Sequence, residues 1–210
     1  MEEDYGSGEK GLDRILALSD GIFAFSLTLL ALSLVVPQLT SGQSNAELSK
    51  KLAEEIPSFF VYFWSFFVVS FYWFAHHRVF RYIKRYDSLI MWYNIIFLMF
   101  ITLVPFTTNL MKYANLQLTV VIAAIFYSVP GFAISLLWQH SSKNHLLIDK
   151  NLSESIIRWT RIRNYISPLV FIASIPFSYI SPYFTLAFWG VMIPLRIVIK
   201  RKSSARKRFK

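Results

Sequence analysis

The sequence contains no cysteine, which excludes disulfide bonds, thiolate metal sites and cysteine nucleophiles. Charged residues are also scarce, because Asp, Glu, Lys and Arg make up 16% of the 210 residues whereas 55% are hydrophobic and 18% are aromatic. The mean hydropathy of +0.44 is far above that of a soluble domain of this length. A water-soluble fold is therefore not expected.

Six apolar runs predict helices that cross a bilayer, since one crossing takes roughly 20 apolar residues. Helices are expected because backbone polar groups in lipid must be satisfied within the span. The predicted fold class is an all-α integral membrane protein, with one six-helix transmembrane domain over residues 1–210. The predicted spans are 12–36, 57–75, 88–110, 116–138, 164–179 and 182–199.

The basic residues predict an orientation for these helices, because cytoplasmic loops carry an excess of Lys and Arg. Nineteen of the 22 basic residues lie before or within the first turn of the first span, in the second and fourth connections, or from Arg196 near the end of the last span to Lys210. Only Lys50, Lys51 and Lys112 fall in the other connections. Both termini are therefore predicted to be cytoplasmic. The basic tail 200–210 favours membrane lipids as partners over nucleic acid, because it directly follows a membrane helix.

A few polar residues sit at the predicted cytoplasmic ends of the first three spans. Polar groups at membrane depth are costly, so they indicate either a functional site or a network in which each group has a polar partner. The favoured interpretation is a structural clamp that locks three helices together, and the alternative is a proton relay or a catalytic centre. The residues concerned are Arg14, Ser19, Asp20, His76, His77, Trp92 and Asn94.

These polar residues do not predict an enzyme or a bound metal. A single carboxylate does not make an acid and base pair. Adjacent His76 and His77 point about 100° apart on a helix, and the sequence has no HExxH spacing, so a zinc site is not expected. No cofactor is expected.

The first span carries a stripe of large apolar residues with helical spacing. Phe25, Leu29, Leu32 and Val36 recur at i, i+4, i+7 and i+11, and Thr28 lies at the edge of the stripe. Several copies meeting on an axis would form rings narrow enough to gate a pore by excluding water. Alternatively, these residues face lipid or a neighbouring helix.

The sequence resembles the transmembrane protein 175 family of potassium channels, in its bacterial single-unit type. The resemblance covers the first three spans closely. It is carried by Arg14 with Leu18-Ser19-Asp20-Gly21, by Ala75-His76-His77-Arg78, by Asn94, and by Pro105-Phe106 with Thr108.

This resemblance implies a potassium-permeable channel in the plasma membrane, built as a homotetramer. Helix 1 of each subunit would line the pore, with an apolar constriction formed by Phe25, Thr28, Leu29 and Leu32 and with potassium as the permeant ion. Phe25 stands where isoleucine or leucine is usual, and a phenyl ring there narrows or plugs such a pore. The polar residues named above would form the family's structural network.

The alternative function is a proton-coupled membrane transporter that uses Asp20 and His77 as a relay. Such a transporter requires broken helices or repeats at the bilayer midplane, which the sequence does not display. A conventional potassium filter is not expected either, because no string resembles TVGYG and only 7 glycines are present.

Overall fold

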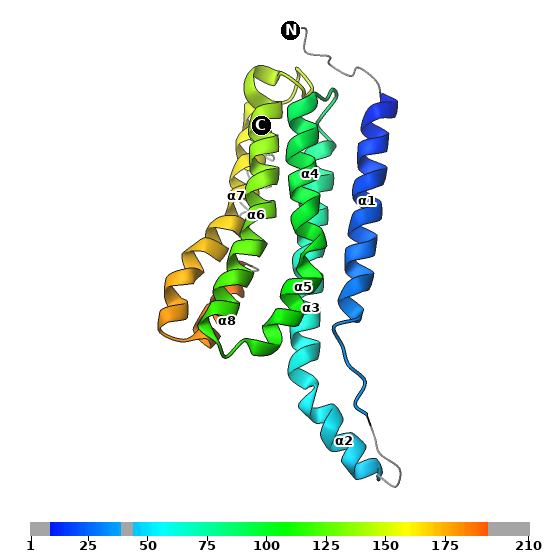
Figure 1. Cartoon of the computed structure of the whole chain (residues 1–210). Helices are drawn as coiled ribbons and strands as arrows, with labels where there is room; N and C mark the ends of the chain where they lie inside the picture. Colours follow the sequence, from blue (N-terminus) through cyan, green and yellow to red (C-terminus); the bar gives the residue numbers. More distant parts are fainter. Residues whose placement is uncertain (1–8, 39–43, 193–210) are drawn as a thin grey trace, which may run out of the picture.

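A computed structural model describes residues 9–38 and 44–192 (Figure 1). This part of the chain is helical apart from isolated β-bridge residues, and one such bridge joins Ile83 and Ile148. The helices are α1 (Glu9–Ala31), α2 (Asn45–Glu54), α3 (Ile56–Phe80), α4 (Ser88–Thr102), α5 (Val104–Leu110), η1 (Met111–Tyr113), α6 (Gln117–Ser142), η2 (Lys143–His145), α7 (Glu154–Ser174), η3 (Ile175–Tyr179) and α8 (Pro182–Trp189).

Four stretches of the described chain are long and apolar enough to cross a membrane: Gly11–Ala31, Ile56–Phe80, Ser88–Tyr113 and Gln117–His145. They coincide with the first four predicted spans. The fifth predicted span overlaps α7, and the sixth begins with α8 and continues beyond the described residues, where the basic tail 200–210 also lies.

Several predicted helix ends differ from the structure, since α3 and α6 end at Phe80 and Ser142 instead of residues 75 and 138. α1 ends at Ala31 instead of residue 36, because the next backbone amides bond three residues back and the chain then runs extended toward Pro37. α7 begins at Glu154 instead of residue 164, after Ser153 in extended conformation. Its first half carries three arginines, so a search for apolar runs misses helical turns that are polar.

The third span is broken near its middle. α4 begins at Ser88 after the N-cap residue Asp87, whose side chain accepts a hydrogen bond from the Ile90 amide over 2.9 Å, and it ends at Thr102. α5 then starts with Pro105 in its first turn. Proline has no amide proton and clashes with the preceding turn, which accounts for the break.

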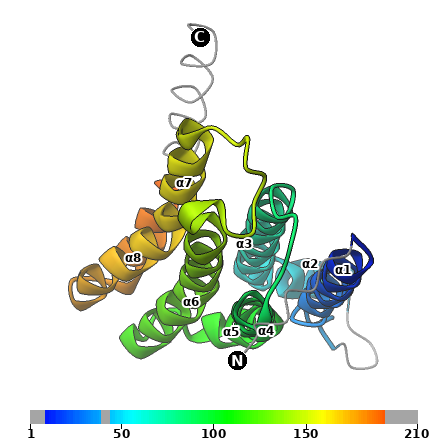
Figure 2. The ribbon, with the colours of Figure 1, turned by 90° about the horizontal axis from the view of Figure 1, so that it is seen from above.

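The described helices form two groups that meet at α6 (Figures 1 and 2). α1 lies at one edge and packs against α3, α4 and α5, while α7 and α8 pack on the other side of α6. The interface of α6 with α7 and α8 is aromatic, since the rings of Tyr127, Phe171 and Trp189 lie 5.3 to 5.6 Å from one another. This arrangement leaves one face of α1 without a partner among residues 9–38 and 44–192.

Two connections are tied together at one end of the bundle. The Lys84 amide donates to the Leu147 carbonyl over 2.8 Å, beside the bridge between Ile83 and Ile148. The start of α1 lies at the same end of the molecule (Figure 1). The basic connections that the sequence assigns to one side of the membrane therefore share one end of the structure.

Candidate pore face and polar cluster

α1 carries an exposed apolar stripe on the face that points away from the subunit. Leu18, Phe25 and Leu32 are 58%, 61% and 76% exposed, and they recur every seven residues. Thr28 is exposed on the same face and Leu29 is half-buried. The predicted stripe is thus accessible to a partner, although Leu32 lies in the turn just after the helix.

The other side of α1 packs into the bundle and carries small or apolar residues, among them Phe23, Ser26 and Leu30, which are at most 1% exposed. The ring of Phe23 lies 5.8 Å from those of His76 and Phe97. In lipid, close packing and hydrogen bonds between helices hold a bundle together, because apolar surface gains little by leaving lipid. The buried face therefore fixes the direction in which the stripe points.

One chain of polar contacts joins α1, α3 and α4 inside the bundle. Asn94 Nδ2 donates to Ser19 Oγ over 3.2 Å, and His76 Nε2 lies 2.9 Å from Asn94 Oδ1. Ser19 in turn donates to the Ile15 carbonyl over 2.8 Å. All three side chains are at most 3% exposed, and the His76 ring stacks between those of Phe80 and Phe97. We call Ser19, His76 and Asn94 the buried triad.

A second contact set lies beside it, at the edge of the bundle. Trp73 Nε1 donates to Asp20 Oδ1 over 2.9 Å, and His77 Nε2 lies 3.7 Å from the same oxygen. The Trp73 and His77 rings are 4.5 Å apart. The side chains of Asp20 and His77 keep 47% and 38% of their surface exposed, so this set is less buried than the triad.

Two predicted network residues are not joined to these contacts. Trp92 is 62% exposed on α4, and Arg14 is exposed near the start of α1. The indole that binds Asp20 is instead Trp73, which the sequence analysis did not single out. The available signal was its position four residues before His77, which places both side chains on one face of α3.

The chemistry open to these groups is limited. Among the described residues, no group of three or more His, Cys, Asp or Glu side chains is arranged to hold a metal ion. The polar side chains of the triad already bond one another. The arrangement therefore favours a structural role in which the polar contacts attach one helix to another. The exposed apolar stripe of α1 is the surface that remains available to another subunit.

Comparison with known proteins identifies the family. A family model described as the endosomal/lysosomal potassium channel TMEM175 matches residues 14–105. A potassium channel of Streptomyces collinus is 32% identical over 85% of this chain and 88% of its own, and one of Chamaesiphon minutus is 30% identical over 91% and 95%.

The chain belongs to the TMEM175 family of potassium channels. A crystal structure of a potassium-selective TMEM175 homolog from Chamaesiphon minutus matches with a TM-score of 0.77 and 25% identity, covering 93% of this chain and 99% of that one. The endosomal/lysosomal proton channel TMEM175 of Gallus gallus is 32% identical over 47% of this chain, which corresponds to 21% of that protein. The family resemblance predicted from the motifs is thereby confirmed.

The matched TMEM175 region runs from Arg14 at the start of α1 to Pro105 at the start of α5. It contains both the exposed stripe and the buried triad. The part shared with the family model is thus the part in which α1 is attached to α3 and α4 with one face left free.

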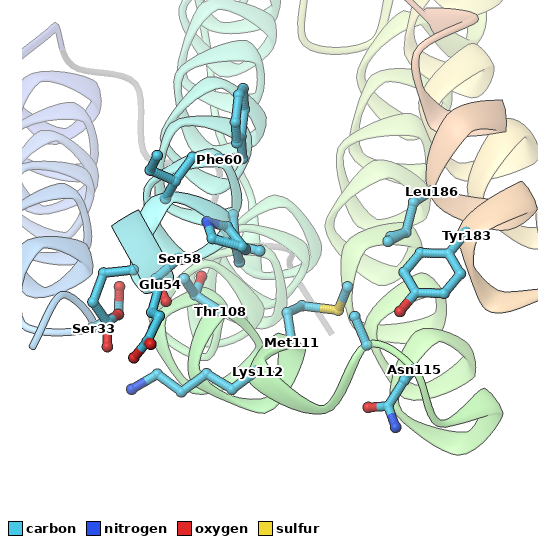
Figure 3. Close-up of a pocket in the computed structure, with 15 residues that line it drawn as sticks. Ser33, Glu54, Ser58, Phe60, Thr108, Met111, Lys112, Asn115, Tyr183 and Leu186 are labelled. Carbon is cyan, nitrogen blue, oxygen red and sulfur yellow. The ribbon is translucent and has the colours of Figure 1, made fainter. Parts of the chain in front are cut away.

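The other end of this TMEM175 subunit holds a cavity of about 710 Å³ (Figure 3). Tyr183 and Leu186 of α8 line one side, Glu54 and Ser58 the other, and Met111 of η1 lies between them. The cavity separates the start of α3 from α8 and lies far from the buried triad along the helices.

Proposed function

We propose that this chain is the subunit of a potassium-permeable channel whose pore is lined by the exposed face of α1. The observation that carries this proposal is the stripe of Leu18, Phe25 and Leu32, which is exposed at the edge of the subunit on a helix long enough to cross a bilayer. Membership of a potassium channel family supports the same reading.

A pore of this kind requires several copies of the chain. α1 is a single helix at the edge of its subunit, so one copy does not enclose a lumen, whereas four copies around an axis bring four α1 faces together. We therefore propose a homotetramer. Each subunit is proposed to cross the membrane six times as one channel domain, with α7 and the segment that begins at α8 as the last two crossings.

The proposed constriction acts through dehydration. Rings of Phe25, Leu29 and Leu32 offer no polar atoms to replace the water around a cation, so a narrow lumen lined by them opposes permeation without charge repulsion. Thr28 Oγ1 donates its proton to the Phe25 carbonyl over 2.8 Å. Its lone pairs therefore remain available as oxygen ligands for a passing potassium ion.

The polar contacts are proposed to hold α1 in place and not to conduct. Asp20 is bound by Trp73 and lies on a different face of α1 from Phe25, since five helical residues advance the direction by about 500°, or 140° beyond a full turn. This placement does not favour a proton-coupled transporter with Asp20 and His77 as its relay. The basic connections support cytoplasmic termini, and the likeness to bacterial relatives of similar length supports a plasma membrane.

The proposed function is tested with the full chain purified into vesicles loaded with potassium. We expect potassium efflux driven by a membrane potential alone, with no proton gradient and no chemical substrate. A pH-sensitive dye inside the same vesicles measures protons, because animal relatives are named proton channels. Efflux that requires a proton gradient would favour the transporter, and proton flux without potassium flux would contradict the potassium channel.

A further inference from the structure

A second recess lies at the end of the bundle where the connections are tied together. It has a volume of about 340 Å³ and lies between α4, α6 and α7. This size is within the range of roughly 300 to 1,000 Å³ that is usual for small-ligand sites. It is lined by Tyr93, Leu136, Gln139, His140, Lys143 and Arg161, and we call it the basic groove.

The basic groove holds two cations without a carboxylate to balance them. Lys143 and Arg161 are exposed, and neither forms an ion pair with another described residue. The nearby carboxylate belongs to Asp87, which is already engaged: its Oδ2 lies 2.5 Å from His140 Nε2, and its Oδ1 accepts from the Ile90 amide. The groove therefore attracts an anion.

The position of the basic groove along the helices indicates which kind of anion it binds. Gln139 and Lys143 stand at the end of the membrane-length stretch Gln117–His145, and the ends of a helix that spans a bilayer meet the lipid headgroups. One turn deeper, Leu136 lines the same groove and is 42% exposed. Tyr93 brings an aromatic ring with a hydroxyl, a side chain that is enriched at the membrane interface.

We propose that the basic groove binds the phosphate of an anionic phospholipid headgroup. Lys143 and Arg161 hold the phosphate oxygens from two helices, and Leu136 contacts the beginning of an acyl chain. A basic pocket between membrane helices on the cytoplasmic side is suited to this ligand. The assignment does not depend on which ion the channel conducts.

The test measures lipid binding to the full chain in detergent by native mass spectrometry, with phosphatidylglycerol as the probe. We expect Lys143→Gln/Arg161→Gln to weaken phosphatidylglycerol binding by more than about tenfold, since each basic residue near a lipid surface contributes roughly a fivefold change. Lys143→Arg/Arg161→Lys keeps both charges and is expected to retain binding, which excludes misfolding as the cause of a loss.

The matched control is Lys150→Gln/Arg158→Gln, which removes the same charge from exposed residues of the same end outside the groove. It is expected to bind phosphatidylglycerol nearly as the unmodified chain does. Equal losses in both double variants would overturn the proposal, because the attraction would then be a general one. Phosphatidylcholine binding with the same affinity would overturn the requirement for an anion, and saturation by inorganic phosphate at equal concentration would overturn the lipid as its source.

Discussion

The buried triad shows how few polar residues are needed to attach a helix within a membrane. Asn94 serves as donor to Ser19 and as acceptor for His76, so one amide joins three helices. A buried polar group that loses its partner costs about 1 to 3 kcal/mol. The amide therefore contributes more through the groups it satisfies than through its own packing.

This geometry predicts an order of stability among substitutions. Asn94→Ala leaves His76 Nε2 without its partner in a buried site and leaves Ser19 only its bond to the Ile15 carbonyl, so it is expected to lower the free energy of unfolding by about 2 to 3 kcal/mol. Asp20→Ala is expected to cost about 1 kcal/mol, because its carboxylate is half exposed and water replaces part of the Trp73 bond. Thermal unfolding in detergent, followed by tryptophan fluorescence, measures both.

Asp13→Ala is the matched control for Asp20→Ala, since Asp13 is an exposed carboxylate on the same helix. It is expected to change stability little. If Asp20→Ala were more costly than Asn94→Ala, the less buried contact with Trp73 would be the main attachment of α1, and the role given to the triad would be wrong.

Sequence reasoning reached most of these residues because polar side chains at membrane depth are conspicuous. It did not predict which of these side chains bond one another. Trp92 and Asn94 are two residues apart and so project about 200° apart on α4. Because Asn94 faces the bundle, Trp92 faces away from it, and the prediction that both belong to one network was wrong for Trp92. Trp73 went unnoticed because a tryptophan within an aromatic run carries no sign that its N–H has a buried acceptor.

At the scale of elements, α6 and α7 approach each other closely where they cross. Gly131 of α6 faces the ring of Pro168 on α7, and a Cβ atom placed on Gly131 would lie 2.5 Å from the proline Cδ. Both helices carry an internal proline nearby, Pro130 and Pro168. The Pro168 ring is rigid and Gly131 has no side chain, so neither residue can change rotamer to relieve a clash.

We therefore expect Gly131→Ala to destabilise the protein by about 1 to 3 kcal/mol, as overpacking of a tight contact does. Gly21→Ala is the control, because an added methyl there meets no atom of the described residues within 4 Å and alanine favours the helix by roughly 0.5 to 1 kcal/mol. Thermal midpoints of the two variants are compared in detergent. A Gly131→Ala protein as stable as the unmodified chain would show that α6 and α7 separate freely.

The existence of the first four spans was predictable from apolar runs, whereas their ends were less so. α2 escaped prediction because it is a polar helix of ten residues with none buried, held at its start by mutual hydrogen bonds between Ser44 and Glu47. The start of α7 escaped because arginines interrupt its hydropathy. Both helix ends depend on local capping and packing, which hydropathy averaged over a sequence window does not detect.

At the scale of the whole molecule, the proposed pore makes the two sides of α1 unequal. Leu29 and Leu27 are both half-buried leucines of this helix, but Leu27 projects about 200° from Phe25 whereas Leu29 projects about 40° from it. We expect Phe25→Ser and Leu29→Ser to raise potassium flux in vesicles by about tenfold, the change that a barrier lower by about 1.4 kcal/mol produces.

Leu27→Ser is the matched control and is expected to leave potassium flux nearly unchanged. Thr28→Val removes the hydroxyl oxygen from the same face and is expected to reduce preference for potassium over sodium more than total flux. Equal flux in Leu27→Ser and Leu29→Ser would mean that α1 does not line the pore.

The orientation of the whole molecule is open to a direct test because the chain contains no cysteine. Ser49 on α2 and Lys150 in the connection before α7 are both exposed and stand at opposite ends of the subunit. We expect Ser49→Cys to react with an impermeant thiol reagent added to intact cells, and Lys150→Cys to react only after the membrane is opened. The reverse pattern would place the buried triad at the outer end.

The bridge between Ile83 and Ile148 has a mechanical consequence for the subunit. The connections before α4 and α7 meet there, whereas at the other end a cavity separates α3 from α8 and the chain through η1 links the two helix groups. Helices joined at one end act as lever arms, and each further residue adds about 1.5 Å to the arm. A small rotation about the bridged end therefore displaces α8 most where Tyr183 and Leu186 face Ser58.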